Sequence, residues 1–517
     1  MHSQYSRRRM LKLTGQTAAI LAALPSSVFA ASTPVAVSGV LTGEEAVRDV
    51  ANKIFADGGN AIDAIIGAAL AAGITAPSKC GIGGYGGAIM IGRAGTHKVT
   101  CIDFDSAAPE AARPDMFPCD AKGNVIGKAN SHGWLAAGVP GTLAGLHLAL
   151  KKYGTKSFRE VVQPAIEMAG KAKPNPHFKY AVLSRVLRTL ADRNSVDSFY
   201  RGDIAQEIAD AFQRNGGLVT DKDLAAYHAR EVKPYELEWN GATIYTAPLC
   251  AGGLTALQAL AVLKAMRWEK MPDSTEAVHA RVEALRLAWR DRSELFGDPE
   301  FVKVPVKHLL SDAYAAELAG QVSQAVKEQR PVPIKMGHLQ QVGTLNLSCA
   351  DQYGNIAALT VTMGNAYGAQ VTVDNLGMVL GHGMARFDPQ PGFPNSVAPG
   401  KRPQHNMCPS MASIDGRPVV AVGAAGGTKI VNAIYDFFSH SVGRKMSLAE
   451  SVNHPRLNTT GSLQLGLDKD WPAAQVNYFK KIGYQVKNQT GAFVSAAVID
   501  PVTGQLDAKS RAGNPFQ

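Results

Sequence analysis

The residues most suited to chemistry are two threonines late in the chain, Thr344 and Thr362. A threonine hydroxyl is a poor nucleophile unless a base accepts its proton. Two hydroxyls within hydrogen-bonding reach can also orient one another. Whether these two act together depends on the elements that carry them.

The two threonines belong to a predicted β-hairpin. Apolar and polar side chains alternate along residues 344–349 and 358–363, which is the period of half-buried strands. A three-residue turn that ends with Gly354 in the left-handed conformation would pair Asp351 with Asn355. This register sets the two threonines directly opposite each other, with Cβ atoms about 5 Å apart.

A glycine pair further along could support attack by such a hydroxyl. The attack leaves a negative oxygen, and each preorganised N–H donor to it is worth about 10²- to 10³-fold in rate. Residues 424–428, AAGGT, precede an apolar helical run that starts near Ile430. The backbone of Gly426 and Gly427 is therefore a candidate oxyanion hole, and the alternative is a plain turn at the start of a helix.

Length and composition indicate a globular protein. The 517 residues are 46% apolar and 19% charged, which argues against a disordered or membrane-embedded chain. They suffice for two or three domains or for one large unit with a deep core. The formal charge is +10, but Lys and Arg are scattered among acids rather than gathered in a stripe, so we expect no nucleic-acid partner.

The N-terminus has the pattern of a cleavable twin-arginine export signal. Residues 6–12, SRRRMLK, precede an uncharged run at 13–24 and a small-residue end, VFA, at 28–30. The apolar run is too short to span a bilayer. We exclude residues 1–30 from the fold, which lowers the formal charge to +6. We expect a periplasmic or secreted protein with no membrane span after signal removal.

Cysteine and histidine spacings do not indicate a metal site. The six cysteines are an even number, which permits disulfides, but they form no C-x-x-C pair. Because twin-arginine cargo is exported folded, we expect mostly free, core-packed thiols. No H-E-x-x-H occurs and no histidine pair has convincing ligand spacing, so we predict no catalytic metal and no cofactor.

Two helices are predicted near the start of the mature chain. Residues 42–45, TGEE, are typical of a capping box, which would open a helix that stops at residues 58–59. Asn60 then caps a second helix. Residues 61–70 of that helix are apolar all round, so we expect it to be buried.

A glycine-rich loop follows at residues 81–87 and leads into a strand at 88–92. Such a loop could hold phosphate, but no Lys-Ser/Thr follows and the order is loop then strand, so close backbone packing is the simpler interpretation. Cys80, beside the loop, could be a thiol nucleophile. It lacks a local base motif, which favours a core cysteine.

Taken together, these features resemble the gamma-glutamyltranspeptidase family of N-terminal-nucleophile hydrolases, and the resemblance covers nearly all of residues 35–515. It is carried by GGNAIDA at 58–64, GVPGT at 138–142, NGG at 215–217, EALRLAWRDR at 283–292 with GDP at 297–299, and the whole run 344–387.

The resemblance implies a precursor that cuts itself between Gly343 and Thr344. The products would be a large subunit, 31–343, and a small subunit, 344–517, that carries Thr344 at its N-terminus. Thr362 matches the family's second threonine, which supports the nucleophile, and the glycine pair matches its oxyanion hole. Residues 311–343 would be a mobile linker that leaves after cleavage.

The resemblance also selects between two folds. Alternating helices and strands fit a doubly wound parallel sheet. The family implies instead an α+β fold, the four-layer αββα sandwich, in which both subunits build two mainly antiparallel sheets between helical layers. We adopt the second.

Cleavage would supply the base that the Thr344 hydroxyl needs. The new α-amine of Thr344 has an unperturbed pKa of about 7.7 to 8, so a useful fraction is neutral and can accept the hydroxyl proton. One residue then supplies nucleophile and base. An acyl-threonine intermediate would be resolved by hydrolysis or by transfer.

The residues that recognise the acyl group depart from the family pattern. The family's arginine for the substrate α-carboxylate is replaced by Asp105, and its aspartate for the α-amino group by Arg386. Its serine pair becomes His405 and Asn406, and the asparagine after the second threonine is replaced by glycine, with Asn365 beside it.

Both charges of the amino-acid clamp have therefore changed sign, and a carboxylate that faced Asp105 would be repelled. We hypothesise that Arg386, with His405 and Asn406, recognises a different acyl group, one that can carry a carboxylate. Asp105 would then pair with Arg386 or bind a cation. The alternative is a purely structural Asp105–Arg386 ion pair.

The leading interpretation is an exported, autoprocessing threonine amidohydrolase or acyltransferase that cleaves a small acyl amide other than a standard gamma-glutamyl compound. Its partners would be that amide and the two subunits of the same precursor. One alternative is a conventional gamma-glutamyltransferase and glutathione hydrolase. Another, of a different class, is a non-catalytic periplasmic binding protein, which would stay in one piece on a denaturing gel.

Overall fold

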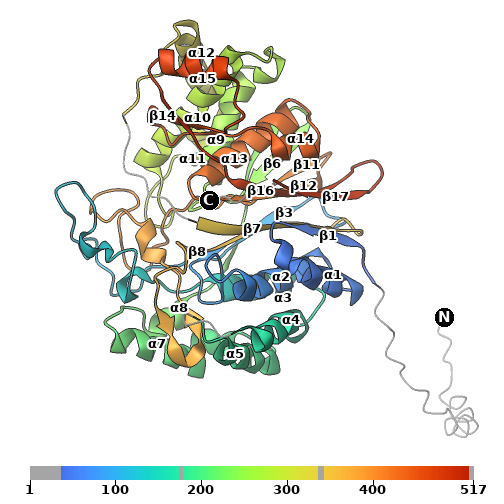
Figure 1. The fold of residues 1–517 in the computed structure, drawn as a ribbon, viewed down its shortest axis with the longest axis vertical. Coiled ribbons are helices and arrows are strands. Elements are labelled where there is room, and N and C mark those ends of the chain that lie inside the picture. Colours follow the sequence, from blue (N-terminus) through green and yellow to red (C-terminus); the bar gives the residue numbers. More distant parts are fainter. Residues whose placement is uncertain (1–35, 174–177, 336–342, 512–517) are drawn as a thin grey trace, which may run out of the picture. The chain divides into compact units, whose positions relative to one another are not determined.

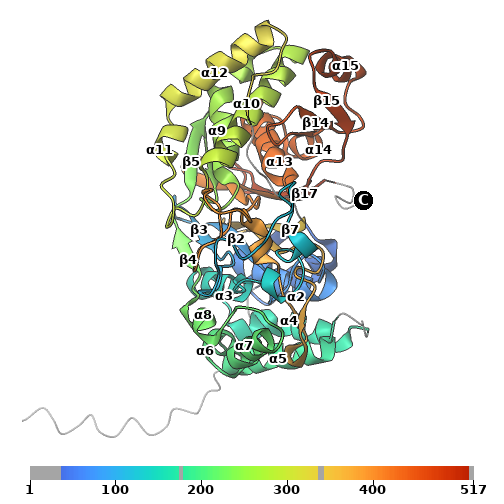
Figure 2. The ribbon, with the colours of Figure 1, turned by 90° about the vertical axis from the view of Figure 1, so that its left-hand side faces the viewer.

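The computed structural model describes residues 36–173, 178–335 and 343–511. The predicted signal, 1–30, lies outside the described residues. Within them, two large antiparallel sheets pack face to face, and helices cover the outer face of each (Figures 1 and 2). This is the α+β sandwich that the sequence predicts, and the parallel alternative is excluded because neighbouring strands in both large sheets are antiparallel.

The first sheet contains strands from both sides of the predicted cleavage point. Its described strands lie in the order β1 (Gly39–Thr42), β7 (Gly343–Asp351), β8 (Ile356–Gly364), β2 (Gly86–Gly92), β3 (Val99–Asp103) and β4 (Arg230–Val232).

The second sheet is shared in the same way. Its described strands lie in the order β17 (Leu506–Ser510), β16 (Phe493–Ile499), β12 (Arg417–Ala425), β11 (Ser410–Ile414), β6 (Ala242–Thr246) and β5 (Tyr235–Trp239). Each large sheet therefore contains strands from both sides of the predicted cleavage point.

Helices from the first part of the chain cover the first sheet. α2 and α3 lie on its strands, and α4 and α5 pack beyond α2, in the lower part of Figure 1. The helices of this layer are α1 (Arg48–Ala56), α2 (Ala61–Thr75), α3 (Thr142–Tyr153), α4 (Phe158–Lys171), α5 (Tyr180–Arg193), α6 (Asp197–Arg201), α7 (Asp203–Arg214) and α8 (Asp221–Ala226).

The other helical layer lies on the second sheet. α9 and α13 contact its strands, and α10 and α12 pack on α9, in the upper part of both views. The remaining helices are α9 (Gly253–Ala265), α10 (Thr275–Leu295), α11 (Val306–Leu309), α12 (Asp312–Lys327), α13 (Lys429–Phe438), α14 (Leu448–Asn453) and α15 (Ala473–Lys481). Among the described residues, no helix has both the length and the apolar character that crossing a membrane requires.

The remaining described strands form two small sheets. One pairs β9 (Thr372–Val373) with β10 (Met378–Val379), and the other joins β13 (Leu457–Asn458), β14 (Gln464–Leu467) and β15 (Gln485–Asn488). The interior between the two large sheets is filled mainly by small and flexible side chains such as Ala88, Met90, Ala350 and Ala421. These let the central strands of the two sheets approach closely.

The second predicted helix is confirmed, and the cap of the first is wrong. The Asn60 side chain accepts hydrogen bonds from Ile62 N (2.8 Å) and Asp63 N (3.0 Å), and α2 is buried on all sides. Thr42 instead belongs to β1, where it pairs with Ser348, and α1 begins only at Arg48 after a 3-10 turn. Hydrogen bonding between β1 and β7 therefore overrides the local capping pattern.

The predicted mobile linker, 311–343, is wrong for its first half. Residues 312–327 form α12, whose first turn is capped by Ser311 Oγ, which accepts from Tyr314 N (3.2 Å). Leu318 and Val322 on this helix are buried. Only the last part of the linker, 336–342, lies outside the described residues.

All six cysteines are free thiols, as expected, and five of them are buried. Burial raises the pKa of the Cys80 thiol to about 12, which suppresses the nucleophilic thiolate. The core-cysteine interpretation of this residue is therefore the better one.

Candidate active site

The hairpin that carries both threonines forms with the predicted turn. Asp351 N donates to Asn355 O (2.9 Å), and Gly354 has φ +94°. The strands pair in the predicted register from Ala350–Ile356 to Leu345–Val361.

At Thr344 the register changes. Continuing the ladder would set Thr344 opposite Thr362, but the next pair is Gly343 with Gly364, so Thr344 lies opposite a β-bulge formed by Thr362 and Met363 of β8. Bulges re-aim a side chain and occur often beside active sites. Thr344 is nevertheless buried, with 3% of its surface exposed.

Thr362 lies where β8 meets the glycine-rich loop. It pairs with Gly86 of β2, and its Oγ1 accepts a hydrogen bond from Gly364 N (2.8 Å). A Cβ added at Gly84 would lie 3.1 Å from Thr362 O. The loop thus packs its backbone against the strand end, as the sequence predicts for residues 81–87.

The glycine pair lies at the same end of the sandwich as Thr344. A Cβ at Gly92, which pairs with Ile356 near the hairpin turn, would meet Pro418 Cβ at 2.5 Å, and a Cβ at Gly423 would meet Asn346 Oδ1 at 1.8 Å. β12 therefore runs across β7, starting near the hairpin turn and ending near Thr344. Gly426 and Gly427 directly follow β12.

The local backbone explains why both positions are glycine. Gly426 has φ +143° and Gly427 has φ +68°, values that side chains with a Cβ rarely adopt. α13 begins two residues later at Lys429, close to the predicted start. The N-terminus of a helix favours a negative oxygen, so the strand, turn and helix together suit an oxyanion hole.

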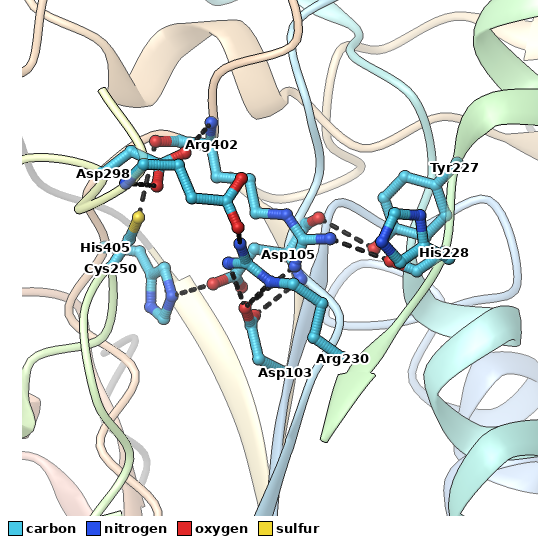
Figure 3. Close-up of polar contacts among 10 residues, drawn as sticks. Asp103, Asp105, Tyr227, His228, Arg230, Cys250, Asp298, Arg402 and His405 are labelled. Atoms are coloured by element: carbon cyan, nitrogen blue, oxygen red, sulfur yellow. Dashed lines mark hydrogen bonds and ion pairs between the residues drawn. The ribbon is translucent and has the colours of Figure 1, made fainter. Parts of the chain in front are cut away.

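The end of β3 and the loop that follows it hold two buried acids, Asp103 and Asp105, with different partners (Figure 3). Asp105 pairs with His405 Nε2, and Asp105 Oδ1 and His405 Nδ1 are buried without hydrogen-bond partners. Burial raises the pKa of the Asp105 carboxyl to about 6, against the charge of His405. The suggested Asp105–Arg386 pair does not form.

Asp103 lies two residues earlier and is fully neutralised. Its Oδ2 accepts from Arg230 Nη2 (2.6 Å) and Arg402 Nη1 (2.8 Å). Burial alone would raise its pKa, but the two guanidinium charges lower it to about 2. Figure 3 shows both arginines converging on this carboxylate.

Arg386 and Asn406 line one cavity of about 370 Å³. The short 3-10 helix Gly383–Arg386 is anchored next to the nucleophile strand, because His382 N donates to Met363 O (3.0 Å). Asn406 lies near the start of α13: a Cβ at Gly252 would lie 3.1 Å from Asn406 O and 2.5 Å from Val431 Cγ2. The cavity wall is therefore tied to β8, which carries Thr362, and to the start of α13, which follows the glycine pair, although its described lining includes neither the two threonines nor the glycine pair.

Two predicted residues have other surroundings. Asn365 follows β8 and donates from Nδ2 to Ser131 Oγ (3.2 Å), and it is not among the described residues that line the cavity. His405 is buried behind the cavity wall, with Tyr85 edge-on at 6.0 Å between ring centroids. Both lie near the site, and neither faces this cavity.

Sequence reasoning missed Arg292, which lines the same cavity from α10. Its Nη2 donates to His405 O (2.8 Å) and Asn406 Oδ1 (3.2 Å). The sequence placed Arg292 only within a helical motif. The residues that Arg292 contacts are distant in the sequence, so no local sequence pattern indicates that Arg292 lines the cavity.

Comparison with known proteins agrees with this architecture. The model of the gamma-glutamyltranspeptidase family matches residues 48–174 and 170–512. The chain is 33% identical over 455 residues to a glutathione hydrolase proenzyme of Escherichia coli K12, covering 78% of each. It is 30% identical to the acylase ACY 1 proenzyme of Pseudomonas sp. SE83, covering 86% of this chain and 87% of that one.

A solved structure shows the same fold. Cephalosporin acylase from Bacillus halodurans superposes with a TM-score of 0.80 at 23% identity, covering 93% of this chain and 96% of that one. Two antiparallel sheets between helical layers, with a threonine at the start of a central strand, have the architecture of N-terminal-nucleophile hydrolases. The chain belongs to the gamma-glutamyltranspeptidase family.

Proposed function

We propose that this protein is an autoprocessing amidohydrolase that uses Thr344 as an N-terminal nucleophile. In the first step, Thr344 Oγ1 attacks the carbonyl carbon of Gly343, and the peptide nitrogen leaves as the α-amine of Thr344. Water then hydrolyses the resulting ester, which yields the Gly343 carboxylate and frees the hydroxyl. The chain is thereby divided into residues 31–343 and 344–517.

In turnover, the freed α-amine accepts the proton of its own hydroxyl as the hydroxyl attacks an acyl amide. The C–N bond breaks, the amine product takes the proton, and an acyl-threonine ester remains. Water hydrolyses this ester, or an amine acceptor takes the acyl group. Thr362 supports the nucleophile, and Gly426 and Gly427 donate to the oxyanion.

One observation carries this proposal: Thr344 lies opposite a bulge at the start of a central strand, at the end of the sandwich where the glycine pair enters α13. A nucleophile and a turn suited to an oxyanion thus meet at one end of the sandwich from distant parts of the chain. A binding protein would need the cavity but not the buried threonine beside the glycine turn.

The amide is proposed to differ from a standard gamma-glutamyl compound. Asp105 replaces the expected arginine and pairs with His405. Arg386 replaces the expected aspartate and lines the cavity. The charges that would hold the α-carboxylate and α-ammonium of a glutamyl group are therefore not at their usual positions.

Three variants test the nucleophile. Thr344→Ala should stay as one band on a denaturing gel and turn over no amide. Thr344→Ser should retain partial cleavage and turnover, because it keeps the hydroxyl. The control is Thr360→Ser, a buried threonine of the same hairpin whose Oγ1 bonds Asn346 (2.8 Å), which should cleave normally. A Thr344→Ala protein that still divides and hydrolyses amides would rule the proposal out.

A conventional gamma-glutamyltransferase and glutathione hydrolase is the second candidate, and the identity with the Escherichia coli glutathione hydrolase proenzyme favours it. Gamma-glutamyl 4-nitroanilide separates the two. Our proposal expects slow release of nitroaniline from it compared with the best non-glutamyl anilide. Fast release, increased by a dipeptide acceptor, would support the second candidate.

We also propose export by the twin-arginine route, from the pattern at residues 6–12. Replacing both Arg7 and Arg8 with Lys should hold the precursor in the cytoplasm when cell fractions are compared. Lys12→Arg, which keeps the pair, serves as the control. Unchanged export of the paired variant would argue against this route.

A further inference from the structure

Two buried guanidinium groups from distant parts of the chain line the cavity whose wall is tied to β8 and α13. Arg292 lies near the end of α10, and Arg386 ends the 3-10 helix Gly383–Arg386. Arg292 is 2% exposed and Arg386 is 7% exposed. Burying one cation is costly and burying two near each other costs more, so the arrangement needs an explanation.

In the part of the chain that the structure describes, neither cation pairs with a carboxylate. Arg292 donates only to neutral oxygens, those of Thr255, His405 and Asn406. The Nε atoms of Arg292 and Arg386 are buried without a hydrogen-bond partner. Guanidinium groups prefer two parallel bonds to a carboxylate. The Arg386 side chain donates to no described residue and can form such bonds with a ligand, whereas both Nη atoms of Arg292 already donate within the chain, so Arg292 contributes mainly its positive charge.

The cavity wall carries a net positive charge. Its described lining includes the cations Lys122, Arg292 and Arg386 against one acid, Asp388. Asp388 is half-buried, and its Oδ1 accepts from Gln390 N (3.0 Å). The other lining side chains that can hydrogen-bond are neutral. The wall therefore favours a ligand with net negative charge.

The rest of the site holds Arg292 in place and keeps Asp105 away from Arg386. Arg292 bonds the His405 carbonyl, and the His405 side chain pairs with Asp105. Asp105 is thereby withdrawn from Arg386, which is left for the cavity. The sign reversal relative to the family pattern thus has a structural consequence: the acid is neutralised by a histidine, while the arginine stays available.

We propose that Arg292 and Arg386 together bind a free carboxylate on the acyl group of the substrate, so that the enzyme cleaves half-amides of small dicarboxylic acids. This inference rests on the proposed function. One carboxyl carbon of the acid forms the amide that Thr344 attacks, and the other carboxylate lies between the two guanidinium groups. A gamma-glutamyl group carries both a carboxylate and an ammonium and has no net charge, so it suits this wall less well.

The test compares matched substrates on the self-cleaved protein. Succinyl and glutaryl 4-nitroanilides are measured beside their methyl esters, which keep the chain and remove the charge. For the better acid, kcat/KM should exceed that of its ester by about 10²-fold, since a paired buried charge contributes bonds of this strength. The difference should appear mainly in KM.

Variants assign the effect to the two arginines. Arg292→Met and Arg386→Met should each reduce the acid-to-ester ratio to within about threefold of unity, and the Lys variants should recover part of it. The control is Arg290→Met, on the same helix, whose guanidinium pairs with Asp291 and lies outside the described cavity lining. Arg290→Met should keep the full ratio. All variants should still divide into two fragments.

A second readout separates this inference from the proposed function. Glutarate is titrated calorimetrically into wild-type protein and into Arg386→Lys, the mildest variant, with glutaramide, which keeps the chain and has no carboxylate, as the control. Tighter binding of glutarate, weakened by the variant, supports the two-arginine site even if no amide is turned over. An acid-to-ester ratio near one in active wild-type enzyme, or equal binding of glutarate and glutaramide, would overturn it.

Discussion

Two groups of buried charges lie near the proposed nucleophile, and they are built on opposite principles. Asp103 receives the guanidinium groups of both Arg230 and Arg402, so its charge is cancelled within the chain (Figure 3). Arg292 and Arg386 have no such acid in the described part of the chain and line a cavity. The first arrangement holds the fold together, while the second leaves charge available to a ligand.

Under the proposed function, the comparison explains how a family scaffold would take a different substrate without changing its frame. The Asp103 cluster joins β3, β4 and the loop before β11, which come from both proposed subunits. Two residues further on, Asp105 is removed from the cavity by His405. Structural and recognition charges can therefore be sorted by asking whether each has a partner of opposite sign.

The largest expected effect is on stability at the neutralised cluster. Asp103→Asn leaves the buried Arg402 without a carboxylate and leaves Arg230 with only the exposed Glu300, which should lower the free energy of unfolding by about 3–5 kcal/mol. Urea unfolding followed by tryptophan fluorescence measures it. A variant as stable as the wild type would show that this cluster does not hold the fold together.

The next effect should appear only at the cavity. Glutarate at 100 times its dissociation constant should raise the free energy of unfolding of the self-cleaved wild type by about 2.7 kcal/mol. It should not stabilise Arg386→Met, because the variant lacks one of the two guanidinium groups. Thermal unfolding with and without glutarate checks this, and equal stabilisation of both proteins would contradict the assignment.

The pH dependence should distinguish the charged substrate from its ester. Burial lowers the pKa of both Arg292 and Arg386 to about 10. A guanidinium is cationic below its pKa and neutral above it, so kcat/KM for a dicarboxylic half-amide should fall about tenfold per pH unit above pH 10. The methyl ester should lack this alkaline limb. Identical profiles for the two substrates would exclude arginine titration as the cause.

The smallest effect concerns the stability of the cavity variants. Arg386→Met removes a buried charge that has no acid partner, so the free energy of unfolding should change by less than about 1 kcal/mol or rise. Urea unfolding beside Asp103→Asn gives the direct contrast. A loss as large as that of Asp103→Asn would mean that the Arg386 charge supports the fold and that the two clusters do not differ.

Features set by short-range patterns could be predicted from the sequence. The turn at Gly354 and the cap at Asn60 depend on residues within four positions of each other, and both form as expected. The glycine pair between β12 and α13 is likewise visible as a glycine turn before an apolar helix. The bulge opposite Thr344 was not visible, because alternation alone continues the ladder through it.

Other features depend on tertiary partners that a local pattern cannot show. Thr42 has the composition of a helix cap, but pairing with Ser348 places it in a strand. The family resemblance suggested a linker at residues 311–343, while burial of Leu318 and Val322 against other helices fixes a packed helix there. His405 meets Asp105 across 300 positions in the sequence, which explains why an Asp105–Arg386 pair was suggested instead.

The most direct test of the account is the N-terminal residue of the smaller fragment after purification. The chain is expected to divide by itself, and sequencing with intact-mass measurement should give a fragment that begins at Thr344 and ends at residue 517. A chain that stays whole through this region, or a fragment that begins at any other residue, would contradict the assignment of Thr344 as the nucleophile.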